Sequence, residues 1–247
     1  MSLTDTKKAF LEHLSELRKV LIYCVISLLA CFIIIFVLFC DELMDFVLAP
    51  IRQFGIDVVY TTLGEVWLTE MKVCFIAGFI AAFPAISFFF WRFLRPALYQ
   101  NERKAFALIY FLSLLLFILG VCFAYFVVLA LTINFFVTTG EGTAVPMLTI
   151  SKYVEFLTSF IIPFGLVFLL PMVVLALTKV GVLQVSTLVK SRKYVIVILA
   201  ILAAILTPPD VVSQLLLLIP MVILWEISIL IAKRVERKKE RSLVKTD

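Results

Sequence analysis

Three glutamates stand in polar segments that also hold basic residues. Glu12 and Glu16 lie in residues 1–19, and Glu102 lies in residues 92–104 together with four Lys and Arg residues. Each carboxylate can pair with a basic neighbour, and such a surface pair contributes about 0–1 kcal/mol. Alternatively, these carboxylates can bind a cationic ligand, because the planar fork of a guanidinium group matches a carboxylate bidentately. In that case two carboxylates from different segments would receive two guanidinium groups.

The sequence holds no residue set that predicts catalysis. His13 is the only histidine, so a histidine-based zinc site or catalytic triad lacks its components. The HExxH, GxSxG and GxxxxGK[ST] patterns are missing from the sequence. The five cysteines lie in or beside apolar runs without a CxxC pair, which predicts buried free thiols rather than a zinc site or a disulfide framework. We therefore expect neither an enzyme nor a cofactor.

The composition is that of a membrane protein. Hydrophobic residues make up 64% of the 247 residues and charged residues 16%, whereas a soluble domain has roughly 45–50% and about 25%. The mean hydropathy is +1.15. In such a chain, basic residues are first read as topology signals, so the net charge of +5 does not predict nucleic-acid binding.

Five apolar runs are candidates for membrane-spanning helices: residues 20–40, 73–91, 105–137, 156–178 and 194–232. The first run is long enough to cross a bilayer, and it is longer than the apolar core of a cleavable signal peptide. Pro84 predicts a kink in the second run. The third run would be about 50 Å long as a helix, so it should tilt or project beyond a hydrocarbon core of about 30 Å.

The last run is expected to form a hairpin of two helices, 194–207 and 211–232. Pro208 and Pro209 interrupt it, and Asp210 is a good N-cap for the second helix. The first helix of this pair would be about 21 Å long, too short for an ordinary bilayer, so local thinning of the membrane should result.

The basic residues predict the topology. Nineteen of the 22 Lys and Arg residues lie in residues 1–19, 92–104, 179–193 and 233–245. The positive-inside rule then gives six spans with both termini in the cytoplasm. The fold class is therefore an all-α polytopic membrane protein. We expect a cytoplasmic amphipathic segment at 1–19, with a surface helix over 3–19, a transmembrane domain at 20–232, and a basic tail at 233–247 that anchors on anionic lipid.

A small-solute secondary transporter is the alternative function. Transporters usually carry an ionisable residue or a broken helix near the middle of the membrane. Glu226 is the candidate of that kind, but it falls near the cytoplasmic end of its helix. There it can snorkel to the surface or bond to a neighbouring helix, and no ion path is evident.

Several motifs together resemble the TatC family, which comprises the polytopic receptor subunits of the twin-arginine protein translocase. The motifs are HLSELR at 13–18, FLRPALYQNER at 93–103, PFGLVFLLP at 163–171, SRKY at 191–194, TPPDVVSQ at 207–214 and IPMVILWE at 219–226. The resemblance extends over roughly residues 7–233. It agrees with the six-span topology, which rests on charge and hydropathy.

The resemblance implies a binding site for signal peptides. TatC-like proteins bind the twin-arginine signal peptides of folded precursor proteins at the cytoplasmic face. The two recognition carboxylates of the family match Glu16 and Glu102. Further positions of the same motifs are Leu14, Arg18, Phe93, Pro96, Leu98, Tyr99 and Arg103.

The resemblance also implies partners in the cell membrane. Thr207, Asp210 and Gln214 match the outer hairpin, where single-span subunits of the TatA/TatB type dock. The multimeric complex uses the proton gradient for export and performs no chemistry on its cargo. From the residues themselves, Asp210 caps a helix first, and Gln214 can bond to a partner or to the neighbouring turn. One departure is Leu169, where the family often has a glutamate.

Overall fold

The computed structural model describes residues 3–94, 103–140, 147–180, 183–206 and 211–243. These residues form an almost entirely helical protein. In chain order the elements are α1 (Leu3–Leu38), α2 (Cys40–Arg52), β1 (Val58–Val59), α3 (Glu65–Leu94), α4 (Arg103–Phe123), the π-helical turn η2 (Ala124–Leu129), α5 (Ala130–Gly140), β2 (Leu148–Thr149), α6 (Ile150–Val167), α7 (Leu170–Val180), α8 (Val185–Lys190), α9 (Arg192–Leu206) and α10 (Val211–Leu243).

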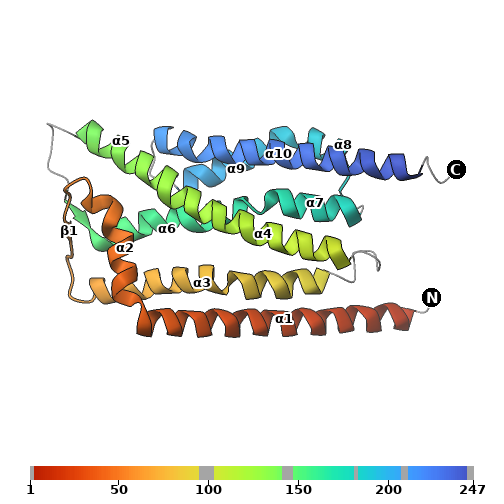
Figure 1. Cartoon of the computed structure of the whole chain (residues 1–247), viewed down its shortest axis with the longest axis horizontal. Coiled ribbons are helices and arrows are strands. Elements are labelled where there is room, and N and C mark those ends of the chain that lie inside the picture. Colours follow the sequence, from red (N-terminus) through yellow and green to blue (C-terminus); the bar gives the residue numbers. More distant parts are fainter. Residues whose placement is uncertain (1–2, 95–102, 141–146, 181–182, 207–210, 244–247) are drawn as a thin grey trace.

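The long helices lie side by side along the longest dimension of the molecule (Figure 1). Within the described part of the chain, five helical stretches are long and apolar enough to cross a membrane: Ser15–Leu38, Glu65–Phe93, Ala107–Thr139, Ile150–Thr178 and Ser213–Arg234. The remaining expected span is α9, which has 15 residues and is about 22 Å long at 1.5 Å per residue.

Helix α1 runs without a break from Leu3 to Leu38. The prediction of helix over residues 3–19 is therefore confirmed, but the expected separate surface helix is wrong. Residues 3–38 contain neither Pro nor Gly, so nothing in the backbone ends the helix before the apolar run. The N-terminal segment is a direct extension of the first span.

Helices α1 and α3 pack closely against each other. A Cβ atom on Gly78 would lie 2.8 Å from the Cα atom of Phe32, so only glycine permits this approach. Nearer the other end of the pair, the rings of Tyr23 and Phe89 stack with centroids 5.3 Å apart. Pro84 lies inside α3, and the helix continues through it.

The third apolar run is one helical rod. Helix α4, η2 and α5 follow each other directly over residues 103–140, and the rod crosses its neighbours obliquely (Figure 1). This geometry agrees with the tilt predicted from its length. The π-helical turn inserts an extra residue into the helical ladder, a feature that re-aims side chains.

The fourth apolar run is divided into α6 and α7. The helical ladder is interrupted at Phe168 and Leu169, two residues before Pro171, because proline lacks the amide donor of a regular helix. Leu169 is partly buried in this break. Its carbonyl accepts hydrogen bonds from the amides of Met172 and Val173 at 2.9 and 3.0 Å.

The last two helices form the predicted hairpin. α9 ends at Leu206 and α10 begins at Val211, and the two helices pack together in antiparallel fashion (Figure 1). α10 continues to Leu243, so the first part of the basic tail is helical. No Pro or Gly occurs between residues 221 and 243, so this stretch contains no residue that would break the helix.

Sequence reasoning missed α2, which lies across one end of the molecule (Figure 1). Its buried residues are Met44, Val47, Leu48 and Ile51. This spacing is that of one helical face, and it was a readable signal in the segment 41–71. Two two-residue strands, β1 and β2, pair in parallel next to α2, with Val58 opposite Leu148.

Candidate functional site

The molecule has two ends, which lie at opposite extremes of its longest axis (Figure 1). We call one the basic end: it holds the first turns of α1, the last turn of α3, the first turn of α4, and α8 and the C-terminal part of α10. The other is the cap end, where α2, β1 and β2 lie. The start of α1 and the end of α10, which are the first and last described helical turns, both lie at the basic end.

The predicted signal-peptide residues that the structure describes are all at the basic end. Glu16 and Arg18 are exposed on α1, and Phe93 is half-buried in the last turn of α3. Leu14 is part of α1, and Arg103 is the first residue of α4. Pro96, Leu98, Tyr99 and Glu102 lie outside the described residues. The fold thus brings residues 14–18 to the same end as both helices that flank segment 95–102.

Polar contacts inside the helix bundle fix the positions of α3 and α4 near this end. The indole Nε1 of Trp91 donates to Ser113 Oγ at 3.1 Å, and Ser113 Oγ donates to the carbonyl of Ile109 at 2.7 Å. The hydroxyl of Tyr110 donates to the carbonyl of Pro84 at 3.1 Å. Buried hydrogen bonds of this kind are costly to break in an apolar environment. They hold the two helices that frame segment 95–102 in one relative position.

A second contact at the basic end joins the helices of the hairpin. Arg192 at the start of α9 donates from Nη2 to Glu226 Oε2 of α10 at 2.7 Å. Both side chains are partly exposed, at 39% and 40%, so water screens the pair. Of the two alternatives for Glu226, snorkelling to the surface or bonding to a neighbouring helix, the structure shows the bond to a neighbouring helix. The contact gives Glu226 a structural partner on α9.

The hairpin presents an exposed apolar stripe, which we call the hairpin stripe. On α10 it consists of Val211, Leu215, Ile219, Ile223, Ile227 and Leu230. Their spacing of three or four residues places them on one helical face. The opposite face, with Leu217, Met221 and Ile229, is fully buried. Gln214 donates from Nε2 to the carbonyl of Ala200 at 3.1 Å, so it holds α10 to α9. Thr207 and Asp210 lie outside the described residues.

At the cap end, Glu65 joins three segments of the chain. Its Oε2 atom accepts from the backbone N–H and hydroxyl of Thr61 at 2.7 and 2.8 Å, and from the N–H of Thr62 at 3.3 Å. Its Oε1 atom accepts from the Ser151 hydroxyl at 2.6 Å. A glutamate that bonds back to amides before its own helix is a capping arrangement. Here it also fixes the start of α6 beside the start of α3.

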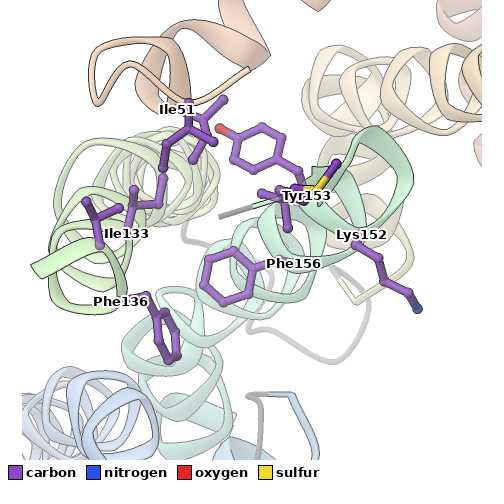
Figure 2. A pocket seen from close by; sticks show the side chains of 10 residues that line it. Ile51, Ile133, Phe136, Lys152, Tyr153 and Phe156 are labelled. Carbon is purple, nitrogen blue, oxygen red and sulfur yellow. The ribbon is translucent and has the colours of Figure 1, made fainter. Parts of the chain in front are cut away.

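An apolar pocket of about 410 Å³ opens at the cap end between α2, α5 and α6. Figure 2 shows Ile51, Ile133, Phe136, Tyr153 and Phe156 around it. The stem of Lys152 contributes to the lining, whereas its ammonium group points away (Figure 2). That ammonium group lies 3.2 Å from the carboxylate of Glu155. The Tyr153 hydroxyl also has a partner, because it donates to the carbonyl of Val47 at 2.8 Å. The described lining is otherwise apolar.

Comparison with known proteins assigns the chain to a family. The family model for Sec-independent protein translocase protein (TatC) matches residues 12–220. The chain belongs to the TatC family. It is 39% identical over 236 residues to TatC of Carboxydothermus hydrogenoformans, which covers 95% of this chain and 97% of that protein. It is 36% identical over 237 residues to TatC of an Escherichia coli strain, which covers 94% and 91%.

Solved structures of TatC have the same fold. A crystal structure titled as the twin-arginine translocase receptor TatC superposes with a TM-score of 0.82 at 38% identity, over 90% of this chain and 98% of that one. A second, in the detergent DDM, gives a TM-score of 0.83 at 37% identity, over 89% and 99%. The predicted family and helical membrane fold are thereby confirmed. As a TatC protein, the chain is a multi-pass translocase component and not an enzyme, which sets aside the transporter alternative.

Proposed function

We propose that this TatC protein is the signal-peptide receptor of a twin-arginine translocase in the cytoplasmic membrane, with its basic end and both termini in the cytoplasm. One observation carries the proposal. Helix α1 brings Glu16 to the end of the molecule where α3 and α4 flank the segment that contains Glu102. The relatives' titles name a twin-arginine receptor, and such a receptor needs anionic groups that two arginines can reach.

The chemistry of the ligand follows from these carboxylates. A guanidinium group donates two parallel hydrogen bonds to one carboxylate, and a lysine ammonium cannot reproduce that geometry. Glu16 and Glu102 would each receive one arginine of the signal peptide. Apolar residues of the peptide would lie against Leu14, Phe93, Pro96, Leu98 and Tyr99, while Arg18 and Arg103 complete the site. Close packing of α1 on α3, supported by the Tyr23–Phe89 stack, keeps the site together.

A peptide-retention experiment tests the receptor site. The purified protein should retain a signal peptide with paired arginines at least tenfold better than one with paired lysines. Glu16→Gln and Glu102→Gln should each reduce retention of the arginine peptide by about tenfold or more, which corresponds to at least about 1.4 kcal/mol. Glu236→Gln is the matched control, because Glu236 lies on α10 near the same end. Equal retention of both peptides, or undiminished retention by both variants, would refute the site.

We further propose that single-span subunits of the TatA/TatB type dock on the hairpin stripe. An exposed apolar face on a spanning helix fits another apolar helix, and polar residues add interhelical bonds of about 0.6 kcal/mol. Thr207 and Asp210 follow α9 and precede α10 in the sequence, and both lie outside the described residues. Gln214 already bonds within the hairpin, so its part is to shape the docking surface.

Co-purification tests this docking surface. Ile219→Gln combined with Ile223→Gln places two polar groups on the stripe and should reduce co-purification of the single-span subunit at least fivefold. The same change at Ile26 and Ile33, which are exposed on α1 at 57% each, serves as the control. Equal losses from both pairs would locate the effect in general membrane packing and contradict the assignment.

A further inference from the structure

Two cysteines far apart in the sequence meet near the cap end. The Sγ atoms of Cys40 and Cys74 lie 3.5 Å apart, across 34 positions of sequence. Cys40 is the first residue of α2, and Cys74 belongs to α3. The sequence predicted buried thiols without disulfides. In the structure Cys74 has no exposed surface, whereas Cys40 is partly exposed. The two thiols already touch, so a bond between them requires little movement of the chain.

We propose that Cys40 and Cys74 are a modification site: a reversible disulfide formed by exchange with a thiol oxidoreductase of an oxidising compartment. The proposal goes beyond receptor function but uses the proposed orientation, which places the cap end outside the cytoplasm. Disulfides persist on that side of a bacterial membrane and are rare in the cytoplasm. The partly exposed thiol is the one that an external oxidant can reach, and the fully buried one is protected until the second step.

The exchange balances without any further reagent. The sulfur of Cys40 attacks the disulfide of the oxidoreductase, loses its proton, and releases one oxidoreductase thiol. The sulfur of Cys74 then attacks Cys40 Sγ, loses its proton, and releases the second oxidoreductase thiol. One S–S bond forms in this chain and one breaks in the oxidant, so two thiols are oxidised and one disulfide is reduced.

The position of the pair gives the bridge a structural consequence. The chain bends at Phe39, where α1 ends and α2 begins. A Cys40–Cys74 bond would fix this bend covalently to α3. It would also close residues 40–74 into a loop that contains α2, β1 and Glu65. Closing a loop reduces the conformational freedom of the unfolded chain, so the oxidised protein should unfold at a higher temperature than the reduced one.

Thiol counting provides the test. The purified protein is treated with copper–phenanthroline or left reduced, then denatured and labelled with a maleimide polymer that adds a fixed mass per thiol. The reduced chain, which has five cysteines, should carry five labels, and the oxidised monomer should carry three. Cys40→Ser should carry four labels with or without oxidant. Cys31→Ser, the matched control from α1, should fall from four labels to two.

Other results would overturn the proposal. Five labels on the oxidised wild type would mean that the pair does not close. A loss of two labels in Cys40→Ser would assign the bond to other cysteines. In cells grown in oxidising medium, with thiols blocked before lysis, three labels would support formation in the membrane and five would refute it. Oxidation should also raise the unfolding temperature of the wild type but not that of Cys40→Ser.

Discussion

At the scale of single residues, a proline and a tyrosine form one structural unit. Pro50 lies inside α2 and has no N–H, so the carbonyl of Phe46, four residues earlier, loses its helical donor. The hydroxyl of Tyr125 donates to this carbonyl at 2.6 Å. The ring of Tyr125 also stacks on Phe46, with centroids 4.6 Å apart. Tyr125 lies in the π-helical turn. This irregular turn therefore carries the side chain that donates a hydrogen bond to the Phe46 carbonyl of α2.

Tyr125→Phe should therefore lower the free energy of unfolding by about 0.5–1.5 kcal/mol, the typical net contribution of one hydrogen bond, because this bond is only part-buried. The stacked ring is kept, so the change removes the hydrogen bond and little else. In a Pro50→Ala background the helical donor is restored, and the cost of Tyr125→Phe should fall by at least half. Thermal unfolding in detergent of the two single variants and the double variant measures this coupling.

Tyr153→Phe is the matched control for that coupling. Its hydroxyl donates to the carbonyl of Val47 at 2.8 Å, and Val47 has a non-proline residue, Ile51, four positions later. Its cost should not depend on residue 50. If Pro50→Ala changed both tyrosine variants equally, the coupling would come from a shift of α2 rather than from the orphaned carbonyl.

At the scale of elements, the α1–α3 contact depends on one glycine. A Cβ atom on Gly78 meets the backbone of Phe32 at 2.8 Å, and backbone cannot move aside as a side chain can. Gly78→Ala should separate the two helices, lower the unfolding temperature, and weaken retention of the twin-arginine peptide, because Glu16 depends on α1 for its position. Gly64→Ala is the control, since its Cβ would meet nothing within 4 Å. Unchanged peptide retention by Gly78→Ala would show that the site tolerates movement of α1.

The elements also show how far sequence reasoning extends. The lengths of the apolar runs and the positions of the basic residues predicted the spans, because a bilayer admits only helices that satisfy their own backbone groups and retains basic residues on the cytoplasmic side. The Pro208–Pro209–Asp210 sequence predicted the hairpin, because it ends one helix and caps the next. The boundary of α1 was misplaced, because a change from polar to apolar residues does not break a helix. α2 was overlooked because it contains Pro50, and a proline ordinarily breaks a helix. Here the hydroxyl of Tyr125 replaces the missing donor. The two residues of that hydrogen bond are 79 positions apart in the sequence, so no short sequence pattern predicts it.

The candidate site was only partly predictable for the same reason. Motif resemblance identified Glu16 and Glu102, and the fold brings the segments around them to one end. The contacts that hold those segments, Trp91 to Ser113 and Tyr110 to Pro84, join residues of common types with no distinctive spacing. Such side-chain pairs arise from the angle at which two helices cross, and a single sequence does not encode that angle in any short pattern.

At the scale of the whole molecule, the separation of charge predicts the orientation of the protein in the membrane. Basic side chains gather at the basic end, and the cap end carries Asp45, Glu65 and Glu155 beside its few lysines and arginines. Positive residues are retained on the cytoplasmic side during insertion. The molecule should therefore insert with the cap end outside, which would place the partly exposed thiol of Cys40 on the side of the oxidising compartment and the Glu16 site on the side of cytoplasmic precursors.

Single-cysteine variants in a cysteine-free background test this orientation directly. Leu63 is 98% exposed at the cap end, and Lys190 is exposed at the end of α8. A membrane-impermeant maleimide should label Leu63→Cys in intact cells, whereas it should label Lys190→Cys only after the membrane is permeabilised. Because the two positions lie at opposite ends of the helix bundle, we expect opposite labelling results for them. Labelling of Lys190→Cys in intact cells would invert the topology and, with it, place the Glu16 site on the wrong side for a receptor of cytoplasmic precursors.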